Sequence, residues 1–444
     1  MLTQGGAAKV HLFAHYADDD IIARRGAQTW SMSQFRHDVT ALAQCLPEHS
    51  HVINACSDRY RFLVSFAAAL ARRQISVMPA SLAPATLRAV SQAYTDMYAI
   101  TDRGDLPIPH LPYPAHLDAS GPLLDLHIPG QQIASIQFTS GSTGDPKPIP
   151  KTWSTLVHSA RAAGERLAIS SLRGGNIVST VPHQHSYGLE SNILLALQHG
   201  LAVEAGSPLY PADVRAVLFS TPRPRILVTT PVHLRALIAE RGGMPAIDLL
   251  LSATAALPTS LAIAAERCFL APLMEIYGCT EAGQIAARRT AQETDWHLFE
   301  GITVFQNNTG NWAKGPAVEG IAPLQDAIDF TAPQHFRLGE RAQDMVNVAG
   351  KRSSLPYLNT QLLSIPGVED GVFLIDEVPI GMVQRLMAVV VAPTLTIEAV
   401  RQGLRERLDP AFIPRKLALV DTLPRNATGK LVRGDLLALL GRSS

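Results

Sequence analysis

Short apolar strands alternate with helical segments along most of this chain, and this alternation limits the possible folds more than any other feature. His51–Cys56 and Ile75–Pro79 have the composition of strands, while Ser31–Leu46 and Phe62–Arg72 have the apolar spacing of helices. Further strands are expected at Asn176–Val181, Ala202–Glu204, Ile226–Thr229 and Asp248–Ser252. Because strands separated by helices usually pair in parallel, the sequence predicts an α/β fold with helix-covered, parallel-rich sheets.

The C-terminal hundred residues have a different pattern. Strands are expected at Val372–Ile375 and Leu386–Val391, followed by an amphipathic helix at Ile397–Leu408. A chain of 444 residues is also too long for one compact core. We therefore expect a large N-terminal domain at 1–341 and a small, mobile α+β domain at 342–444, with a hinge near 341–344.

Composition excludes several classes of protein. Lys+Arg and Asp+Glu both number 38, so no net charge favours binding to nucleic acid or an anionic membrane. The N-terminus lacks the apolar core of a signal peptide, and no segment has the length of a membrane span. The four cysteines lack zinc-ligand spacing: Cys45, Cys56, Cys268 and Cys279. Reduced, mostly buried thiols in a cytoplasmic protein are the expectation.

A loop rich in glycine and hydroxyl groups follows the apolar strand Ile133–Phe138. It reads Thr-Ser-Gly-Ser-Thr-Gly-Asp-Pro-Lys over residues 139–147. Glycines let backbone N–H groups turn toward an anion, and hydroxyls and a lysine add donors, so the loop suits polyphosphate. It lacks the GxxxxGK[ST] pattern, which excludes a P-loop kinase. For the loop alone, a flexible surface turn remains an alternative.

This loop resembles the phosphate-binding motif of the adenylate-forming superfamily, which includes acyl- and aryl-CoA synthetases, nonribosomal adenylation domains and luciferases. The sequence departs from the family pattern at Pro148, where a glycine is usual. The resemblance implies that ATP contacts Thr139, Ser140, Gly141, Ser142, Thr143, Gly144 and Lys147.

Two later segments resemble the family's adenine-site motifs. Glu275–Glu281 contains Tyr-Gly-Cys-Thr-Glu and is similar to Y-G-x-T-E. The resemblance places Tyr277 and Gly278 at adenine and Thr280 at the α-phosphate, while Glu281, with Thr139, would hold Mg²⁺. Ser252–Leu257 loosely resembles the G-A-P-L-type turn beside adenine, which implies nucleotide contacts by Thr254 and Ala255. Here Thr254 and Ala256 replace the usual glycine and proline.

Pro182–Leu189 resembles the motif of the acyl pocket, and His185 matches the residue at the substrate carboxylate. His183 has no assigned role, and a structural histidine or a zinc-binding H-x-H pair remain alternatives. The residues implied to contact the acid are small, polar or aromatic, which favours a small aryl acid: His185, Ser186, Tyr187, Gly188, Ala255 and Gly283.

The ribose and hinge positions are assigned by spacing. Asp326 takes the place of the family's ribose-binding aspartate, because Arg341 follows at the family's distance. Glu340 is the rival, but it directly precedes Arg341, where the family has a glycine. Gln343 stands at the hinge position, usually Asp or Lys, and Gly350 matches the turn lining the thiol channel.

Leu423–Arg433 resembles the C-terminal P-x-x-x-x-G-K-[IL]-x-R motif and makes Lys430 the implied catalytic lysine, together with Glu281 and His185. A solvated surface lysine is the alternative. The resemblance implies an AMP-forming ligase that activates a carboxylic acid with ATP, releases pyrophosphate, and transfers the acyl group to a phosphopantetheine thiol.

The short chain and its compressed segment Arg288–Glu319 resemble stand-alone ligases of aryl polyene and xanthomonadin pigment pathways. These load hydroxybenzoate-like acids onto an acyl carrier protein, which implies a carrier partner in trans. A basic surface could receive it: Lys351, Arg352, Arg415 and Lys416. Free CoA as acceptor, an adenylating enzyme without thiol transfer, and a non-catalytic nucleotide-binding regulator remain alternatives.

Overall fold

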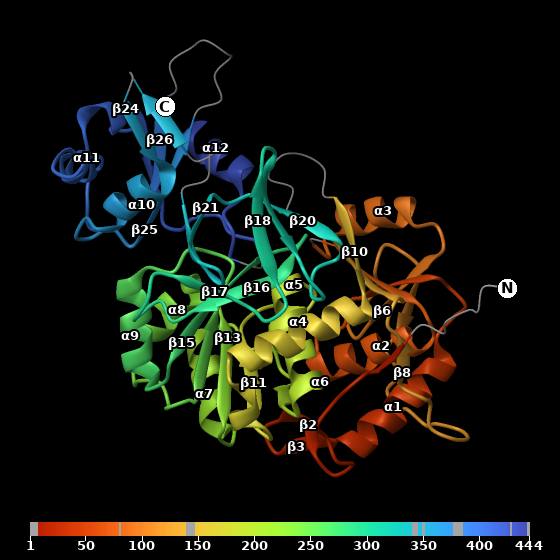
Figure 1. Cartoon of the computed structure of the whole chain (residues 1–444). Helices are drawn as coiled ribbons and strands as arrows, with labels where there is room; N and C mark the ends of the chain where they lie inside the picture. Colours follow the sequence, from red (N-terminus) through yellow and green to blue (C-terminus); the bar gives the residue numbers. More distant parts are fainter. Residues whose placement is uncertain are drawn as a thin grey trace. The chain divides into compact units, whose positions relative to one another are not determined.

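The computed structural model describes residues 8–79, 81–138, 147–339, 345–348, 351–375, 385–426 and 429–441. The chain divides into two compact units (Figure 1). Met1–Leu324 with Phe330–Phe336 form the first unit, and Gln325–Asp329 with Arg337–Ser444 form the second. The predicted α/β fold is confirmed.

One sheet of the first unit holds the strands that flank the phosphate loop. Within the described residues, its strand order is β10 (Pro148–Thr152), β9 (Ile133–Phe138), β5 (Ile75–Met78), β4 (His51–Asn54), β6 (Met97–Thr101) and β7 (His110–Pro112). Strands β9, β5, β4, β6 and β7 pair in parallel, whereas β10 returns antiparallel to β9. The predicted loop therefore connects the two strands of a hairpin at the edge of this sheet.

The longer sheet carries the other predicted motifs. Among the described strands its order is β21 (Ile328–Ala332), β22 (His335–Leu338), β17 (Trp296–Leu298), β16 (Gly283–Arg288), β15 (Leu273–Cys279), β14 (Leu249–Ser252), β13 (Arg225–Thr229), β11 (Asn176–Ser179), β12 (Ala202–Glu204), β2 (Ile21–Arg25) and β3 (Gln28–Ser31). From β15 through β14, β13, β11 and β12 to β2, each strand pairs in parallel with the next. Strand β16 pairs antiparallel to β15. Figure 1 shows β2 and β3, near the N-terminus, beside the middle of the chain.

Helices begin where a side chain caps their first N–H groups. Ser31 caps α1 (Met32–Cys45), Asp58 caps α2 (Arg59–Ala71), Thr152 caps α4 (Trp153–Arg166) and Thr230 caps α8 (Pro231–Ile238). The first unit also contains α3 (Pro84–Ala93), α5 (Ser186–Gly188), a π-helix η2 (Leu189–Leu194), α6 (Leu195–His199), α7 (Pro211–Ser220), a 3₁₀ turn η1 (Ile169–Leu172) and α9 (Thr259–Phe269). Smaller sheets are formed by β1 (Lys9–His11) with β8 (His127–Pro129), and by β18 (Thr303–Asn307), β19 (Gly310–Lys314) and β20 (Ile321–Leu324).

The second unit shows the strand periodicity expected from its sequence. Its elements are β23 (Met345–Val348), β24 (Lys351–Ser354), α10 (Leu355–Leu363), β25 (Asp370–Ile375), β26 (Leu386–Val391), α11 (Ile397–Arg405), η4 (Pro410–Phe412), β27 (Lys416–Leu419) and α12 (Arg433–Gly441). Alternate residues of β26 enter different cores: Ala388 and Val390 pack with Leu404 of α11, whereas Met387 and Val389 pack with Leu436 of α12.

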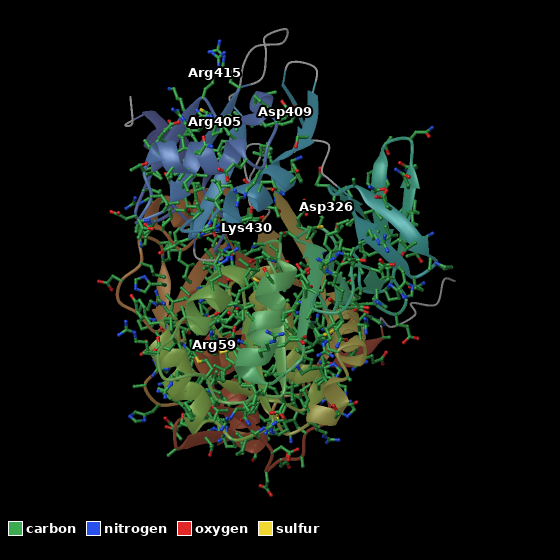
Figure 2. All side chains as sticks on the ribbon, turned by 90° about the vertical axis from the view of Figure 1, so that its left-hand side faces the viewer. Arg59, Asp326, Arg405, Asp409, Arg415 and Lys430 are labelled. Atoms are coloured by element: carbon green, nitrogen blue, oxygen red, sulfur yellow. The ribbon has the colours of Figure 1, made fainter. Side chains whose placement is uncertain are left out.

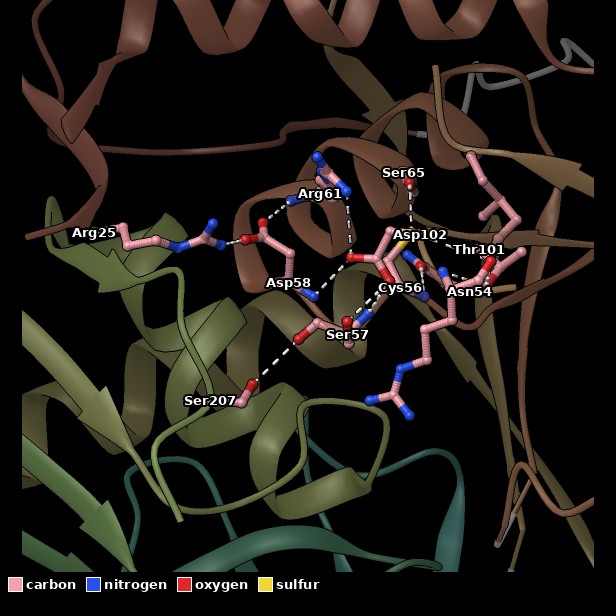
Figure 3. A network of polar contacts seen from close by, with 12 residues as sticks. Arg25, Asn54, Cys56, Ser57, Asp58, Arg61, Ser65, Thr101, Asp102 and Ser207 are labelled. Atoms are coloured by element: carbon pink, nitrogen blue, oxygen red, sulfur yellow. Dashed lines mark hydrogen bonds and ion pairs between the residues drawn. The ribbon is translucent and has the colours of Figure 1, made fainter. Parts of the chain in front are cut away.

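A polar network ties the two large sheets of the first unit together (Figure 3). Asp102, which follows β6, accepts hydrogen bonds from Ser57 N at 2.7 Å and Asp58 N at 3.0 Å. Asp58 also pairs with Arg25 of the other sheet, and Ser207 Oγ donates to Ser57 O at 3.1 Å. The start of α2 is therefore fixed to both sheets.

Arg59, the first residue of α2, is fully buried beside this network. Its guanidinium donates to Ser179 O at 2.6 Å, Val181 O at 3.3 Å and Gly206 O. Burial lowers the pKa of Arg59 to about 10. These carbonyl groups lie at or just beyond the ends of β11 and β12, so one side chain from α2 fixes the exit of two strands of the longer sheet.

Cys56 is buried, Cys268 and Cys279 are partly buried, and Cys45 is exposed, which corrects the expectation of buried thiols for Cys45. Cys45 stands at the last position of α1, where the helix leaves the core. Burial raises the pKa of Cys56 and of Cys279 to about 12, so both thiols stay protonated at neutral pH.

No helix among the described residues is long and apolar enough to cross a membrane.

We predict that Arg59→Leu lowers the free energy of unfolding by about 3 kcal/mol, because several buried carbonyl groups lose their donor. Arg61→Leu is the control, since Arg61 is exposed and its guanidinium lies 3.8 Å from the Asp102 carboxylate. It should cost under about 1 kcal/mol. Denaturant unfolding measures both values, and equal losses would contradict the role assigned to Arg59.

Candidate active site

The predicted adenine residues, together with Thr280 and Glu281, lie at or just beyond the ends of β14 and β15. The two strands are parallel, with Ser252 opposite Glu275, so the segments after them leave the sheet at the same edge. β15 and β16 form a hairpin in which Gly278 faces Gln284 and Cys279 faces Gly283, with Thr280 and Glu281 in its turn. Ligands of α/β sheets bind at the carboxyl ends of parallel strands, so this edge is a suitable place for a nucleotide.

Gly278 is required by the geometry of this hairpin. A Cβ atom at this position would lie 2.1 Å from the Gly283 carbonyl oxygen and 2.9 Å from Gln284 Cα. Real Cβ atoms do not approach backbone so closely, so any side chain would push β15 and β16 apart. The glycine of the Tyr-Gly-Cys-Thr-Glu motif therefore sets the shape of the turn that presents Thr280 and Glu281.

The Tyr277 ring packs inside an aromatic cluster. Its centroid lies 5.5 Å from that of Trp296 and 5.6 Å from that of Phe336, and the residue is only 9% exposed. The Arg288 guanidinium lies over the Trp296 ring, with its Cζ atom 4.4 Å from the ring centroid. The packing fixes the orientation of the Tyr277 ring. Its predicted contact with adenine stays a prediction.

Thr254 stands where the family usually has glycine, and the backbone explains that preference. Its φ angle is +79°, in the left-handed region that glycine adopts without strain. For a β-branched residue this conformation costs on the order of 1 kcal/mol. The turn after β14 is thus retained despite the substitution, and the neighbouring Ala255 is exposed on it.

Four of the predicted acid-binding residues, His185 to Gly188, form a compact turn before η2. Gly188 is required here, because a Cβ atom would lie 2.1 Å from Pro182 O. His185 is half-buried and Tyr187 is buried, and the Tyr187 hydroxyl has no hydrogen-bond partner within the described part of the chain. Ser186 Oγ donates to Glu190 at 3.1 Å. A buried hydroxyl without a partner is a suitable contact for a polar group on an acid.

His183 has a structural environment that differs from that of His185. Its ring packs against Phe62 at 4.4 Å, and its Nε2 lies 2.9 Å from the carbonyl oxygen of Cys56. Burial, with a contribution from the nearby Arg59, lowers the pKa of His183 to about 3. His183 therefore joins α2 to the acid-binding turn as a neutral side chain.

The phosphate loop itself lies outside the described residues, which excludes Thr139, Ser140, Gly141, Ser142, Thr143 and Gly144. Its ends are described: Phe138 of β9 pairs with Pro148 of β10, and Lys147 is exposed. Pro148 is the first residue of an edge strand, where a missing N–H is tolerated. Its substitution for glycine therefore preserves the hairpin.

Two buried ionisable residues connect these motifs, and the sequence did not single them out. Lys151 of β10 is 1% exposed and its ammonium donates to the backbone carbonyl of Glu281 at 2.6 Å. Burial lowers the pKa of Lys151, and the Glu190 carboxylate opposes that shift. Glu190 is 3% exposed and accepts hydrogen bonds from Ser159, Ser186 and Gln284.

In the second unit, a tight turn presents Lys430. The Lys430 N–H donates to Asn426 Oδ1 at 2.9 Å, and Asn426 N donates to Lys430 O at 2.8 Å. Arg425 donates to Gly429 O at 2.9 Å and pairs with Asp370 of β25 at 2.6 Å. The backbone around Lys430 is thus fixed to the sheet, while its side chain is exposed (Figure 2).

Asp326 is half-buried and groups with the second unit. It lies in the link between β20 and β21, where Gly339 N donates to Ala327 O at 2.8 Å. The intervening hairpin of β21 and β22 brings residues 325–329 beside residues 337–339. The assignment of Asp326 to the ribose stays a prediction. Arg341, Gln343, Gly350 and the predicted hinge at 341–344 lie outside the described residues.

A family model described as "AMP-binding enzyme" matches residues 11–308. A 4-coumarate–CoA ligase of Rhodobacter capsulatus is 30% identical over 52% of this chain and 58% of its own length. A 4-coumarate–CoA ligase of Halorhodospira halophila is 30% identical over 68% of this chain and 76% of its own length. The chain belongs to the AMP-binding enzyme family.

Two further proteins are similar to this chain at lower identity. A 3,4-dihydroxybenzoate–[aryl-carrier protein] ligase of Bacillus anthracis is 23% identical over 68% of this chain and 73% of its own. The o-succinylbenzoate CoA synthetase of Bacillus subtilis, in complex with an acyl-adenylate intermediate, has the same fold, with a TM-score of 0.80 and 17% identity over 94% of this chain and 95% of that one. The family and its ligase relatives identify this chain as an AMP-forming, ATP-dependent ligase of the acid–thiol kind.

We predict that Gly278→Ala abolishes most activity of this AMP-binding enzyme, because the added methyl group displaces the turn holding Thr280 and Glu281. ATP-dependent pyrophosphate release should fall at least about 100-fold, as expected when a preorganised charge-stabilising group is displaced. Gly104→Ala is the control, since a Cβ atom there meets nothing within 4 Å. Activity near that of the control would show that the turn tolerates a side chain.

The buried His183 predicts a dependence of stability on pH. In the unfolded chain His183 takes up a proton near pH 6.5, whereas in the folded chain it stays neutral down to about pH 3. The free energy of unfolding should therefore fall by about 1.4 kcal/mol per pH unit below pH 6.5 because of this residue. In His183→Asn this contribution disappears. In a His116→Asn control, at an exposed position, the slope should stay that of the wild type. Urea unfolding at pH 7, 6 and 5 measures the free energy of unfolding of each variant. The same dependence on pH in wild type and His183→Asn would contradict this prediction.

Proposed function

We propose that this enzyme activates a small aromatic acid of the hydroxybenzoate type as its acyl-adenylate and transfers it to the phosphopantetheine thiol of an acyl carrier protein. The observation that carries the proposal is the composition of the acid-binding turn, where Ser186 and the buried Tyr187 offer polar groups beside His185. The names of two kinds of relative, coumarate and dihydroxybenzoate ligases, support an aromatic substrate.

In the first step, a carboxylate oxygen attacks the α-phosphorus of ATP, and the bond to pyrophosphate breaks. Two anions approach each other, so neutralisation of charge dominates the barrier. Lys430 supplies one positive charge, Lys147 and the loop 139–144 bind the phosphates, and His185 orients the carboxylate. Thr280 contacts the α-phosphate, and Tyr277 and Gly278 contact adenine. Asp326 and Arg341 bind the ribose.

The residues at the β15–β16 turn fit a magnesium ion. Glu281 offers a half-buried carboxylate, and Lys151 holds its backbone through the carbonyl oxygen. Mg²⁺ prefers oxygen ligands and usually takes one or two carboxylates with phosphate oxygens, so Glu281 and Thr139 are its proposed protein ligands. When bound, the ion would supply further neutralisation of the phosphate charge.

In the second step, the thiol attacks the acyl carbon and AMP leaves with the bonding electrons. The domain at 342–444 rotates about the hinge near Gln343, and Gly350 lines the channel for the thiol. Rotation also keeps water from the reactive anhydride. Arg415, directly before β27, is exposed (Figure 2). Lys416, the first residue of β27, is exposed as well. With Lys351 and Arg352 of β24 they form the proposed docking surface for an acidic carrier protein.

The test is pyrophosphate release with 3-hydroxybenzoate, 3,4-dihydroxybenzoate, 4-coumarate and octanoate, each without thiol, with CoA, and with phosphopantetheinylated carrier protein. Stimulation by a hydroxybenzoate with acyl transfer to the carrier protein alone supports the proposal. Transfer to CoA supports the second candidate, an aryl-CoA synthetase, which the two coumarate–CoA ligases favour. Release without transfer to either thiol would contradict both.

We predict that Lys430→Ala lowers acid-dependent pyrophosphate release by about 10²–10³-fold, because one positive charge is lost from the adenylation step. Lys314→Ala is the control, since Lys314 is an exposed lysine of β19 without a proposed role. The folded state is checked by thermal unfolding. Full activity in Lys430→Ala would remove this lysine from the proposed mechanism.

A further inference from the structure

Glu190 is a buried carboxylate that accepts hydrogen bonds from three donors near the proposed site. Its Oε2 accepts from Ser159 Oγ at 3.0 Å and from the Gln284 backbone N–H at 3.1 Å, and its Oε1 accepts from Ser186 Oγ at 3.1 Å. The three donors come from α4, β16 and α5. One side chain on the π-helix η2 thus joins three elements that are far apart in the sequence.

Two of these donors belong to the walls of the proposed acid pocket. Ser186 is itself a proposed pocket residue, and Gln284 directly follows Gly283. Gly283 has φ +75°, and a Cβ atom there would lie 3.3 Å from Glu190 Oε2. A second bond reinforces the tie between η2 and β16, because Gln284 Nε2 donates to Ser191 Oγ at 2.6 Å.

Lys151 completes the arrangement on the ATP side. Lys151, Ser159, Glu190 and Gly283 are neighbours in the first unit. The Lys151 ammonium donates to Glu281 O at 2.6 Å, at the turn proposed to hold the metal. A buried carboxylate and a buried ammonium are costly unless each finds partners, and here the partners are backbone and hydroxyl groups of Ser159, Ser186, Gln284 and Glu281.

We propose that Glu190 is a positioning residue that sets the acid pocket by holding Ser186 and the Gly283–Gln284 backbone in fixed relation. The proposal rests on the proposed function, because it concerns the acid-binding part of that site. Glu190 contacts the acid through neither oxygen; it acts through the two pocket walls. Its loss should therefore weaken binding of the acid more than binding of ATP.

The experiment compares Glu190→Leu with the conservative Glu190→Gln. A glutamine can keep its carbonyl oxygen toward Ser159 and Gln284 N and turn its NH₂ group to Ser186, whose hydroxyl accepts as well as donates. Leucine keeps none of these bonds. Glu204→Leu is the matched control, since Glu204 is 4% exposed in the same unit and accepts from Gly206 N, outside the proposed site.

Steady-state pyrophosphate release is measured with 3-hydroxybenzoate, or with the panel acid that the wild type uses fastest. Glu190→Leu should raise KM for the acid about tenfold, the effect of losing charged hydrogen bonds, with KM for ATP within about twofold. Glu190→Gln should stay within about threefold of wild type for both. An unchanged acid KM in Glu190→Leu, an equal rise in both KM values, or the same pattern in Glu204→Leu would overturn the proposal.

Hydrogen exchange without substrate separates this proposal from the proposed function. The amide of Gln284 should exchange at least about tenfold faster in Glu190→Leu than in wild type, and at the wild-type rate in Glu204→Leu. If the wild type used no panel acid, the proposed function would fail, and this exchange rate alone would decide whether Glu190 fixes β16. An unchanged exchange rate of the Gln284 amide in Glu190→Leu would overturn the proposal that Glu190 is a positioning residue.

Discussion

The close approach of the β15 and β16 backbones at Gly278 and Gly283 is the constraint on which the rest of the candidate site depends. At this point the parallel part of the long sheet ends and the antiparallel part begins. Since no Cβ atom fits at Gly278, the turn after it can carry Thr280 and Glu281 close to the strand ends. The neighbouring turns at Thr254 and at Ser186 are placed relative to this hairpin.

Buried charged groups hold these turns in place. Arg59 fixes the ends of β11 and β12, Lys151 fixes the Glu281 carbonyl, and Glu190 fixes Ser186 and β16. Burying each of these charged groups costs desolvation free energy that an apolar side chain would not cost, so such groups contribute little to the free energy of unfolding. Their directional bonds to backbone carbonyl and amide groups instead select one geometry among packings of similar energy.

Most of the strands and helices were predictable because their signal is local. The strands β9 and β12 match the predicted segments because each is a short, largely apolar run. The helix α11 begins at the predicted Ile397 because its buried residues recur at helical spacing. The motif residues were found by resemblance, and the structure gives physical reasons for several of them, such as the tight contacts at Gly188 and Gly278. Glu190, Lys151, Arg425 and Asn426 were missed, since a lone charged residue in a helix or strand looks like solvated surface.

The sequence by itself determined the alternation of elements, the order of the motifs and the membership of the chain in its family. These follow from the periodicity of apolar side chains and from motifs whose residues stand close together in the sequence. Only the tertiary structure decided which distant residues share an environment: that His183 is buried against Phe62 while His185 is half-exposed, and that Glu190 joins α4, α5 and β16. The physical reason is that hydrogen bonds and desolvation depend on positions in space, and strand crossovers bring together residues whose separation in sequence carries no trace of their contact.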